Sequence, residues 1–156
     1  MEKSYSKKAT ADLAEHIYKT SKMGAESISD VLPKVKSNSS GEKESFIDEL
    51  THEYSEYEKI SSKAEQILTA MSVKPKEESF VARMSAKAGI MMNTMSDPGI
   101  SHVAGMMMEG LTMGISDTTR RVRKAEEEKC SDEVLGLGNE LISFQEKSNE
   151  KMKEYL

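Results

Sequence analysis

The sequence predicts an all-α protein: an up-down bundle of two antiparallel helix hairpins, joined by a crossover that contains a shorter, methionine-rich helix. Three observations predict this fold. Apolar residues recur at intervals of three and four along most of the 156 residues, alternating strand-like patterns are absent, and turns rich in Pro, Gly or Ser separate the periodic segments. The composition, 37% hydrophobic and 31% charged, is normal for a bundle in which every helix exposes a wide polar face.

The first hairpin is expected to pair helices at about residues 10–33 and 42–71. Pro33 should kink or end the first helix, and the short polar turn at 37–41 favours antiparallel packing. The apolar stripe of the first helix consists of Leu13, Ile17, Gly24, Ile28, Val31 and Val35. That of the second consists of Phe46, Leu50, Glu53, Tyr57, Ile60, Ala64 and Ile67.

The crossover follows Lys74-Pro75-Lys76 and contains a short helix at about 77–95, and the second hairpin begins after the turn at 96–99. Either Asp97 or Ser101 could cap the next helix, at about 100–128. Ser131 is expected to start the last helix, which ends near residue 156. The stripe of this last helix consists of Val134, Leu137, Leu141, Phe144, Gln145, Ser148 and Met152.

Length and composition predict a single domain over residues 1–156, with residues 1–9 as a flexible N-terminal segment. Cys130 is the only cysteine and the N-terminus is polar, so we expect a cytoplasmic protein without an intramolecular disulfide. A net charge of -5 with interspersed signs argues against nucleic-acid binding. The least polar region, 88–116, contains Asp97, His102 and Glu109, which argues against a membrane span.

Several helix-packing segments are similar to segments of known proteins. They are Met23–Glu26, Val31–Lys34, Glu56–Ile60, Met92–Met95 and Met113–Asp117. On these segments the chain, from about residue 10 onwards, resembles a family of small bacterial proteins of the ferritin-like superfamily. Two hairpins joined by one crossover are also the connectivity of ferritin-like bundles. The resemblance implies a fold and no particular activity.

A ferritin-like fold raises the hypothesis of a two-metal carboxylate site. Such a site takes a Glu from each of two helices and a Glu-x-x-His pair from each of the other two. The chain has one such pair, Glu49 and His52, but its last helix carries Ser143 and Asn149 where a second histidine would stand. Glu26 and Glu109 could supply the lone glutamates, although their helical phase points away from the apolar faces.

The alternative that remains is a degenerate iron or manganese site. Its candidate ligands are Glu49, His52, Glu53 and Glu56, with His102 and Glu109 as a separate possibility. Glu53 lies on the centre of its apolar stripe, where a carboxylate must be hydrogen-bonded, metal-bound or neutral. We favour a polar layer in which Glu53 is bonded by one of the following residues: Tyr18, Tyr54, Tyr57, Gln145 or Ser148.

Methionine is the most distinctive residue of the chain, because eight of its twelve methionines lie between Met84 and Met113. Flexible thioethers suit an adaptable or self-associating helix face. The expected interaction surface comprises Met84, Met91, Met95, Met106 and Met113, with close backbone approach at Gly105, Gly110 and Gly114. His102, Met106, Glu109 and Met113 share one stripe and could bind copper, although packing is the commoner role of such a stripe.

The leading functional prediction is a non-enzymatic interaction or structural protein that forms a homodimer or other homo-oligomer and needs no cofactor. The rival is an iron- or manganese-binding oxidoreductase or storage protein that uses the degenerate site. Peripheral membrane attachment through the crossover helix is weaker, because only Arg83 and Lys87 oppose its methionine face. Cys130 lies beside Lys129 near a helix start, where the thiolate could be modestly favoured, although a lone cysteine is most often inert.

Overall fold

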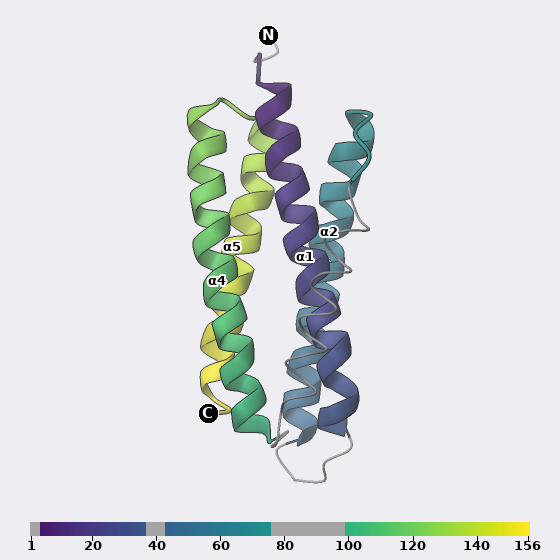
Figure 1. Ribbon diagram of the computed structural model, residues 1–156, viewed down its shortest axis with the longest axis vertical. Coiled ribbons are helices and arrows are strands. Elements are labelled where there is room, and N and C mark those ends of the chain that lie inside the picture. Colours follow the sequence, from purple (N-terminus) through teal and green to yellow (C-terminus); the bar gives the residue numbers. More distant parts are fainter. Residues whose placement is uncertain (1–3, 37–42, 76–98) are drawn as a thin grey trace.

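The computed structural model describes residues 4–36, 43–75 and 99–156, and these ranges contain four α-helices and no strand. The helices are α1 (Lys7–Lys36), α2 (Lys43–Ala70), α4 (Ile100–Glu127) and α5 (Asp132–Lys153). They lie side by side along the long axis of the molecule (Figure 1). The all-helical prediction is therefore confirmed for the described ranges. The predicted crossover helix at 77–95 lies outside them.

The first helix differs from its predicted bounds at both ends. It begins at Lys7 because the Ser6 hydroxyl accepts a hydrogen bond from the backbone N–H of Ala9, at 3.1 Å. It also continues through Pro33 to Lys36, so of the two predicted effects of this proline, a kink or an end of the helix, the end does not occur. Pro33 and Ser29 are both exposed. Water can therefore hydrogen-bond the Ser29 carbonyl that the proline leaves without its helical donor.

The starts of the last two helices differ in their capping. The Ser131 hydroxyl accepts from the backbone N–H of Val134 at 3.3 Å, which confirms the predicted start of α5. Gly99 occupies the N-cap position of α4, and Ser101 lies inside its first turn. Ser101 is therefore not the cap, and Asp97 lies outside the described residues.

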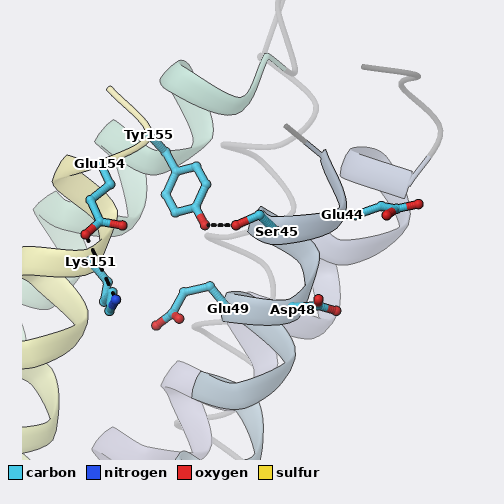
Figure 2. Close-up of a pocket in the computed structure, with 7 residues that line it drawn as sticks. All are labelled: Glu44, Ser45, Asp48, Glu49, Lys151, Glu154 and Tyr155. Atoms are coloured by element: carbon cyan, nitrogen blue, oxygen red, sulfur yellow. Dashed lines mark hydrogen bonds and ion pairs between the residues drawn. The ribbon is translucent and has the colours of Figure 1, made fainter. Parts of the chain in front are cut away.

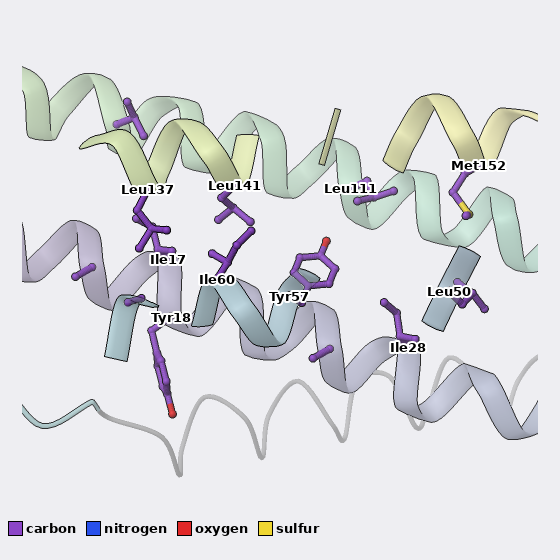
Figure 3. Close-up of a cluster of buried hydrophobic side chains, with 14 of the residues drawn as sticks. Ile17, Tyr18, Ile28, Leu50, Tyr57, Ile60, Leu111, Leu137, Leu141 and Met152 are labelled. Carbon is purple, nitrogen blue, oxygen red and sulfur yellow. The ribbon is translucent and has the colours of Figure 1, made fainter. Parts of the chain in front are cut away.

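The core is a mainly aliphatic seam between the four helices, with α1 against α2, α4 against α5, and further contacts between the two hairpins. Figure 3 shows Ile17, Ile60, Leu141 and Met152 pointing into this seam. The predicted stripes supply most of the buried residues, but Leu68 is buried where Ile67 was expected. Leu68 lies on the same face of α2 as Ile60 and Ala64, because it continues their four-residue spacing.

Two glycines allow neighbouring helices to approach closely. A Cβ atom on Gly24 of α1 would collide with the ring of Tyr57 on α2. A Cβ atom on Gly138 of α5 would lie 2.7 Å from the Val122 side chain of α4.

None of the helices in the described ranges is long and apolar enough to cross a membrane.

Candidate functional site

The most unusual buried group is the carboxyl group of Glu53, on the inner face of α2. Its side chain is 0% exposed, and neither carboxyl oxygen makes a close, well-aligned hydrogen bond among the described residues. Burial, and then the nearby Glu49 carboxylate, raises the pKa of Glu53 to about 8, while the Ser148 hydroxyl acts in the opposite direction. Glu53 is therefore mainly neutral at pH 7.

Glu53 belongs to a layer of buried polar side chains between α2 and α5. Gln145 donates from Nε2 to the Tyr57 hydroxyl at 3.2 Å, and its Oε1 atom has no partner. Ser148, on the same face of α5, is 3% exposed. The predicted polar layer is thus present, but its bonding differs. Tyr57 bonds Gln145 rather than Glu53, and Ser148 is the expected partner whose hydroxyl acts on the pKa of the Glu53 carboxyl group.

Tyr57 is held by packing as well as by this hydrogen bond. Its ring meets Phe144 edge-on, with centroids 4.8 Å apart, and lies directly against Gly24. Burial raises the pKa of the Tyr57 hydroxyl. The hydroxyl therefore stays protonated at any physiological pH and cannot serve as a base.

Glu49 connects this interior to an open hollow between the start of α2 and the end of α5. The hollow has a volume of about 560 Å³ and is lined by Glu44, Ser45, Asp48, Glu49, Lys151, Glu154 and Tyr155. Figure 2 shows the Glu49 side chain reaching from α2 towards α5. A 2.7 Å hydrogen bond joins the Ser45 and Tyr155 hydroxyls. With four carboxylates and one ammonium group, the hollow is acidic.

The predicted metal ligands do not come together as a ferritin-type set. His52 is exposed, although Glu53 beside it is buried and Glu49 and Glu56 are half-buried. Glu26 and Glu109, the candidates for the lone glutamates, are also exposed. In the parts of the chain that the structure describes, no three His, Cys, Asp or Glu side chains form a metal-binding group. The residues present therefore do not fit the two-metal site that the resemblance implies.

The outer face of α4 carries the second group of predicted residues. Met113 is 72% exposed, His102 and Glu109 are exposed, and Met106 is half-buried against the core. Three residues of the predicted stripe, His102, Glu109 and Met113, therefore lie away from the main apolar side, whereas Met106 packs partly against the core. The other proposed surface residues, Met84, Met91 and Met95, lie outside the described residues.

The three glycines of α4 have different surroundings. A Cβ atom on Gly114 would lie 2.5 Å from Gln145 Nε2, so this glycine serves a contact inside the chain. One on Gly105 would make an ordinary 3.9 Å contact with Leu156, whereas one on Gly110 would meet nothing within 4 Å. The expected role of Gly114 in partner approach was wrong. Gly110 has the open space that this role requires.

Sequence reasoning missed a second polar contact, between α1 and α4. The His16 side chain is 9% exposed, and its Nε2 atom lies 3.0 Å from the Thr118 hydroxyl oxygen. Its Nδ1 atom lies 3.8 Å from Asp117. Burial lowers the pKa of His16 to about 4, against the opposing effect of Asp117, so the ring is neutral at pH 7. In the sequence near His16, the only residue that suggested a polar contact for the imidazole was Thr20, one turn along α1.

Cys130 also differs from expectation. It is partly buried in the turn between α4 and α5. Burial, with smaller effects of Glu126 and Asp132, raises the pKa of its thiol. The expected preference for thiolate was therefore wrong, because desolvation and nearby carboxylates both disfavour the anion.

Comparison of the chain with protein-family models, curated proteins and solved structures gives no match. The proposed ferritin-like relationship therefore rests on the helix-packing segments and on the connectivity. Two regions of the molecule bear on its function: the acidic interior around Glu53 and the outer face of α4.

Proposed function

We propose that this protein is a non-enzymatic interaction protein of ferritin-like ancestry that self-associates through the outer face of α4. The observation that carries the proposal is the alignment of Met106, Gly110 and Met113 along one side of this helix. Met113 is 72% exposed, and the space beside Gly110 is open. A flexible apolar side chain next to an open glycine suits docking of another helix at short distance.

The same face is self-complementary when two copies of α4 pack antiparallel. With a two-fold axis between Glu109 and Gly110, Met106 faces the partner's Met113, and His102 faces the partner's Asp117. Asp117 is half exposed on its own chain, where it makes only loose contacts to His16 at 3.8 Å and to Arg120 at 3.9 Å. Pairs of Met106 with Met113 would thus flank the axis, and pairs of His102 with Asp117, which can hydrogen-bond, would lie farther out, as a two-fold interface requires.

Analytical ultracentrifugation of the Met113→Glu variant tests this proposal. Wild type should sediment as a dimer and the variant as a monomer, because the interface would have to desolvate the new carboxylate without a partner for it. Ser143→Glu is the matched control, since it adds the same charge at an exposed position of α5. Equal sedimentation of wild type and Met113→Glu would refute the proposal.

Cysteine crosslinking tests the antiparallel arrangement in a Cys130→Ser background. Gly110→Cys lies near the two-fold axis and should form a disulfide-linked dimer on mild oxidation, whereas Met113→Cys should not. A parallel pairing brings every residue opposite its own copy, so both variants would then crosslink. Crosslinking of neither variant, with a dimer still present, would place the interface elsewhere.

The alternative function is an iron or manganese oxidoreductase or storage protein that uses Glu49, His52, Glu53 and Glu56. The geometry supports it less well, because His52 is exposed while Glu53 is buried. An imidazole and a carboxylate on different sides of α2 cannot bind one ion without rearrangement. We therefore keep the α4 interface as the proposed function.

A further inference from the structure

The interior around Glu53 contains several buried polar atoms that lack a hydrogen-bond partner. Five buried side-chain atoms lack a partner in the described part of the chain, and three of them belong to this layer: both carboxyl oxygens of Glu53 and Oε1 of Gln145. Such atoms are rare in folded proteins because they have lost water without gaining a replacement. A group of them at one place therefore indicates an unfilled requirement for a donor or a cation.

The packing of α2 against α5 places these atoms close to one another. Three contacts fix the antiparallel register: Lys63 with Glu140 at 3.1 Å, Tyr57 with Gln145 at 3.2 Å, and Ser45 with Tyr155 at 2.7 Å. In this register Glu53 lies opposite Ser148, and Gln145 lies one helical turn away along α5. Glu49 lies one turn from Glu53 on α2, towards the hollow.

The acidic hollow lies next to this interior, because Glu49, one helical turn from Glu53, is part of its lining. Glu49 lines the hollow, and it also raises the pKa of Glu53. Glu44, Asp48 and Glu154 add negative charge around it, and the one ammonium group, Lys151, lies 4.0 Å from Glu154. A concave surface with this charge balance attracts small cations.

We propose that Glu53 and Glu49 bind one divalent cation that arrives through the acidic hollow. The Ser148 hydroxyl and the Gln145 amide oxygen are its neutral ligands. All of these ligand atoms are oxygen atoms, and such a ligand set favours hard ions such as Mg²⁺, Ca²⁺ or Mn²⁺ over zinc or copper. His52 is exposed and takes no part. This site differs in ligands and in stoichiometry from a two-metal carboxylate centre, and it does not depend on the α4 interface.

The test is a titration of the full-length, EDTA-treated protein with Mn²⁺, in which electron paramagnetic resonance measures the free ion. Wild type should bind one Mn²⁺ per chain, and excess Mg²⁺ or Ca²⁺ should displace it. Glu53→Gln should weaken binding at least tenfold, because the amide keeps the shape of the side chain but cannot release a proton to become an anionic ligand. Glu146→Gln, an exposed position on α5, is the charge-matched control and should bind as wild type does.

Two further variants keep the result independent of the stability of Glu53→Gln. Ser148→Ala should weaken Mn²⁺ binding severalfold, and Lys151→Gln should strengthen it by a similar factor. Absence of binding to wild type would overturn the proposal, as would two ions per chain or binding that survives Glu53→Gln. Loss of binding in His52→Asn would overturn the all-oxygen ligand set.

Discussion

At the scale of single residues, two glycines of α4 predict opposite effects of the same substitution. Gly114→Ala should destabilise the fold by about 1–3 kcal/mol, since its Cβ would displace Gln145 Nε2 and disturb the buried bond to Tyr57. Gly110→Ala should stabilise it by about 1 kcal/mol, because the site is open and alanine favours helix. Urea unfolding in a Met113→Glu background measures both effects on the monomer. Equal shifts would contradict the assigned contacts.

Residue phase on a helix could be predicted from the sequence, but contacts between helices could not. Spacing along α2 and α5 placed Glu53, Gln145 and Ser148 on inner faces, and all three are buried. The same spacing cannot reveal that Tyr57 accepts from Gln145, or that His16 meets Thr118 across 102 positions of sequence. Those contacts depend on helix register and on the rotation of each helix about its axis.

At the scale of elements, the start of α1 is tied to the turn between α4 and α5. The backbone N–H of Ser6 donates to the Lys129 carbonyl at 2.8 Å, and that of Ser131 donates to the Thr10 hydroxyl at 2.9 Å. In Figure 1 the start of α1 lies at the same end of the bundle as this turn. These bonds join the two hairpins at one end.

Thr10→Val tests this tie. Valine matches the shape of threonine but leaves the Ser131 N–H without its acceptor, so the variant should lose about 1–3 kcal/mol of unfolding free energy. Thr51→Val is the control, since the exposed Thr51 hydroxyl bonds only the Ile47 carbonyl of its own helix. Thermal denaturation compares the two, and equal midpoints would show that the tie contributes nothing to stability.

Helix bounds were predictable to within three residues because their signals are local. Ser131 with Asp132 and Glu133 marked the start of α5, and the polar turn after residue 36 separated α1 from α2. The less accurate predictions used rules whose outcome depends on the residues and solvent around a position. Pro33 lies in an exposed last turn that tolerates it, and the role of Gly114 is decided by a side chain on another helix.

At the scale of the whole molecule, two buried groups give the stability of the fold an unusual pH dependence. The pKa of Glu53 is raised from 4.5 to about 8, and that of His16 is lowered from 6.5 to about 4. Between pH 4.5 and 6.5 the folded state holds an extra proton at Glu53 and lacks one at His16. Because stability rises with pH only where the unfolded state binds more protons, the two effects cancel in this range.

Between pH 6.5 and 8 only Glu53 still differs between the folded and unfolded states, so stability should fall as pH rises. The expected loss is about 2 kcal/mol over this interval, from about 1.4 kcal/mol per unit of pKa difference. Urea unfolding at pH 5, 6.5 and 8, with EDTA present, measures it. In Glu53→Gln the fall above pH 6.5 should vanish, and stability should instead rise from pH 5 to 6.5, because His16 then acts alone. A wild-type protein equally stable at pH 6.5 and 8 would mean that Glu53 is already ionised in the folded state at neutral pH.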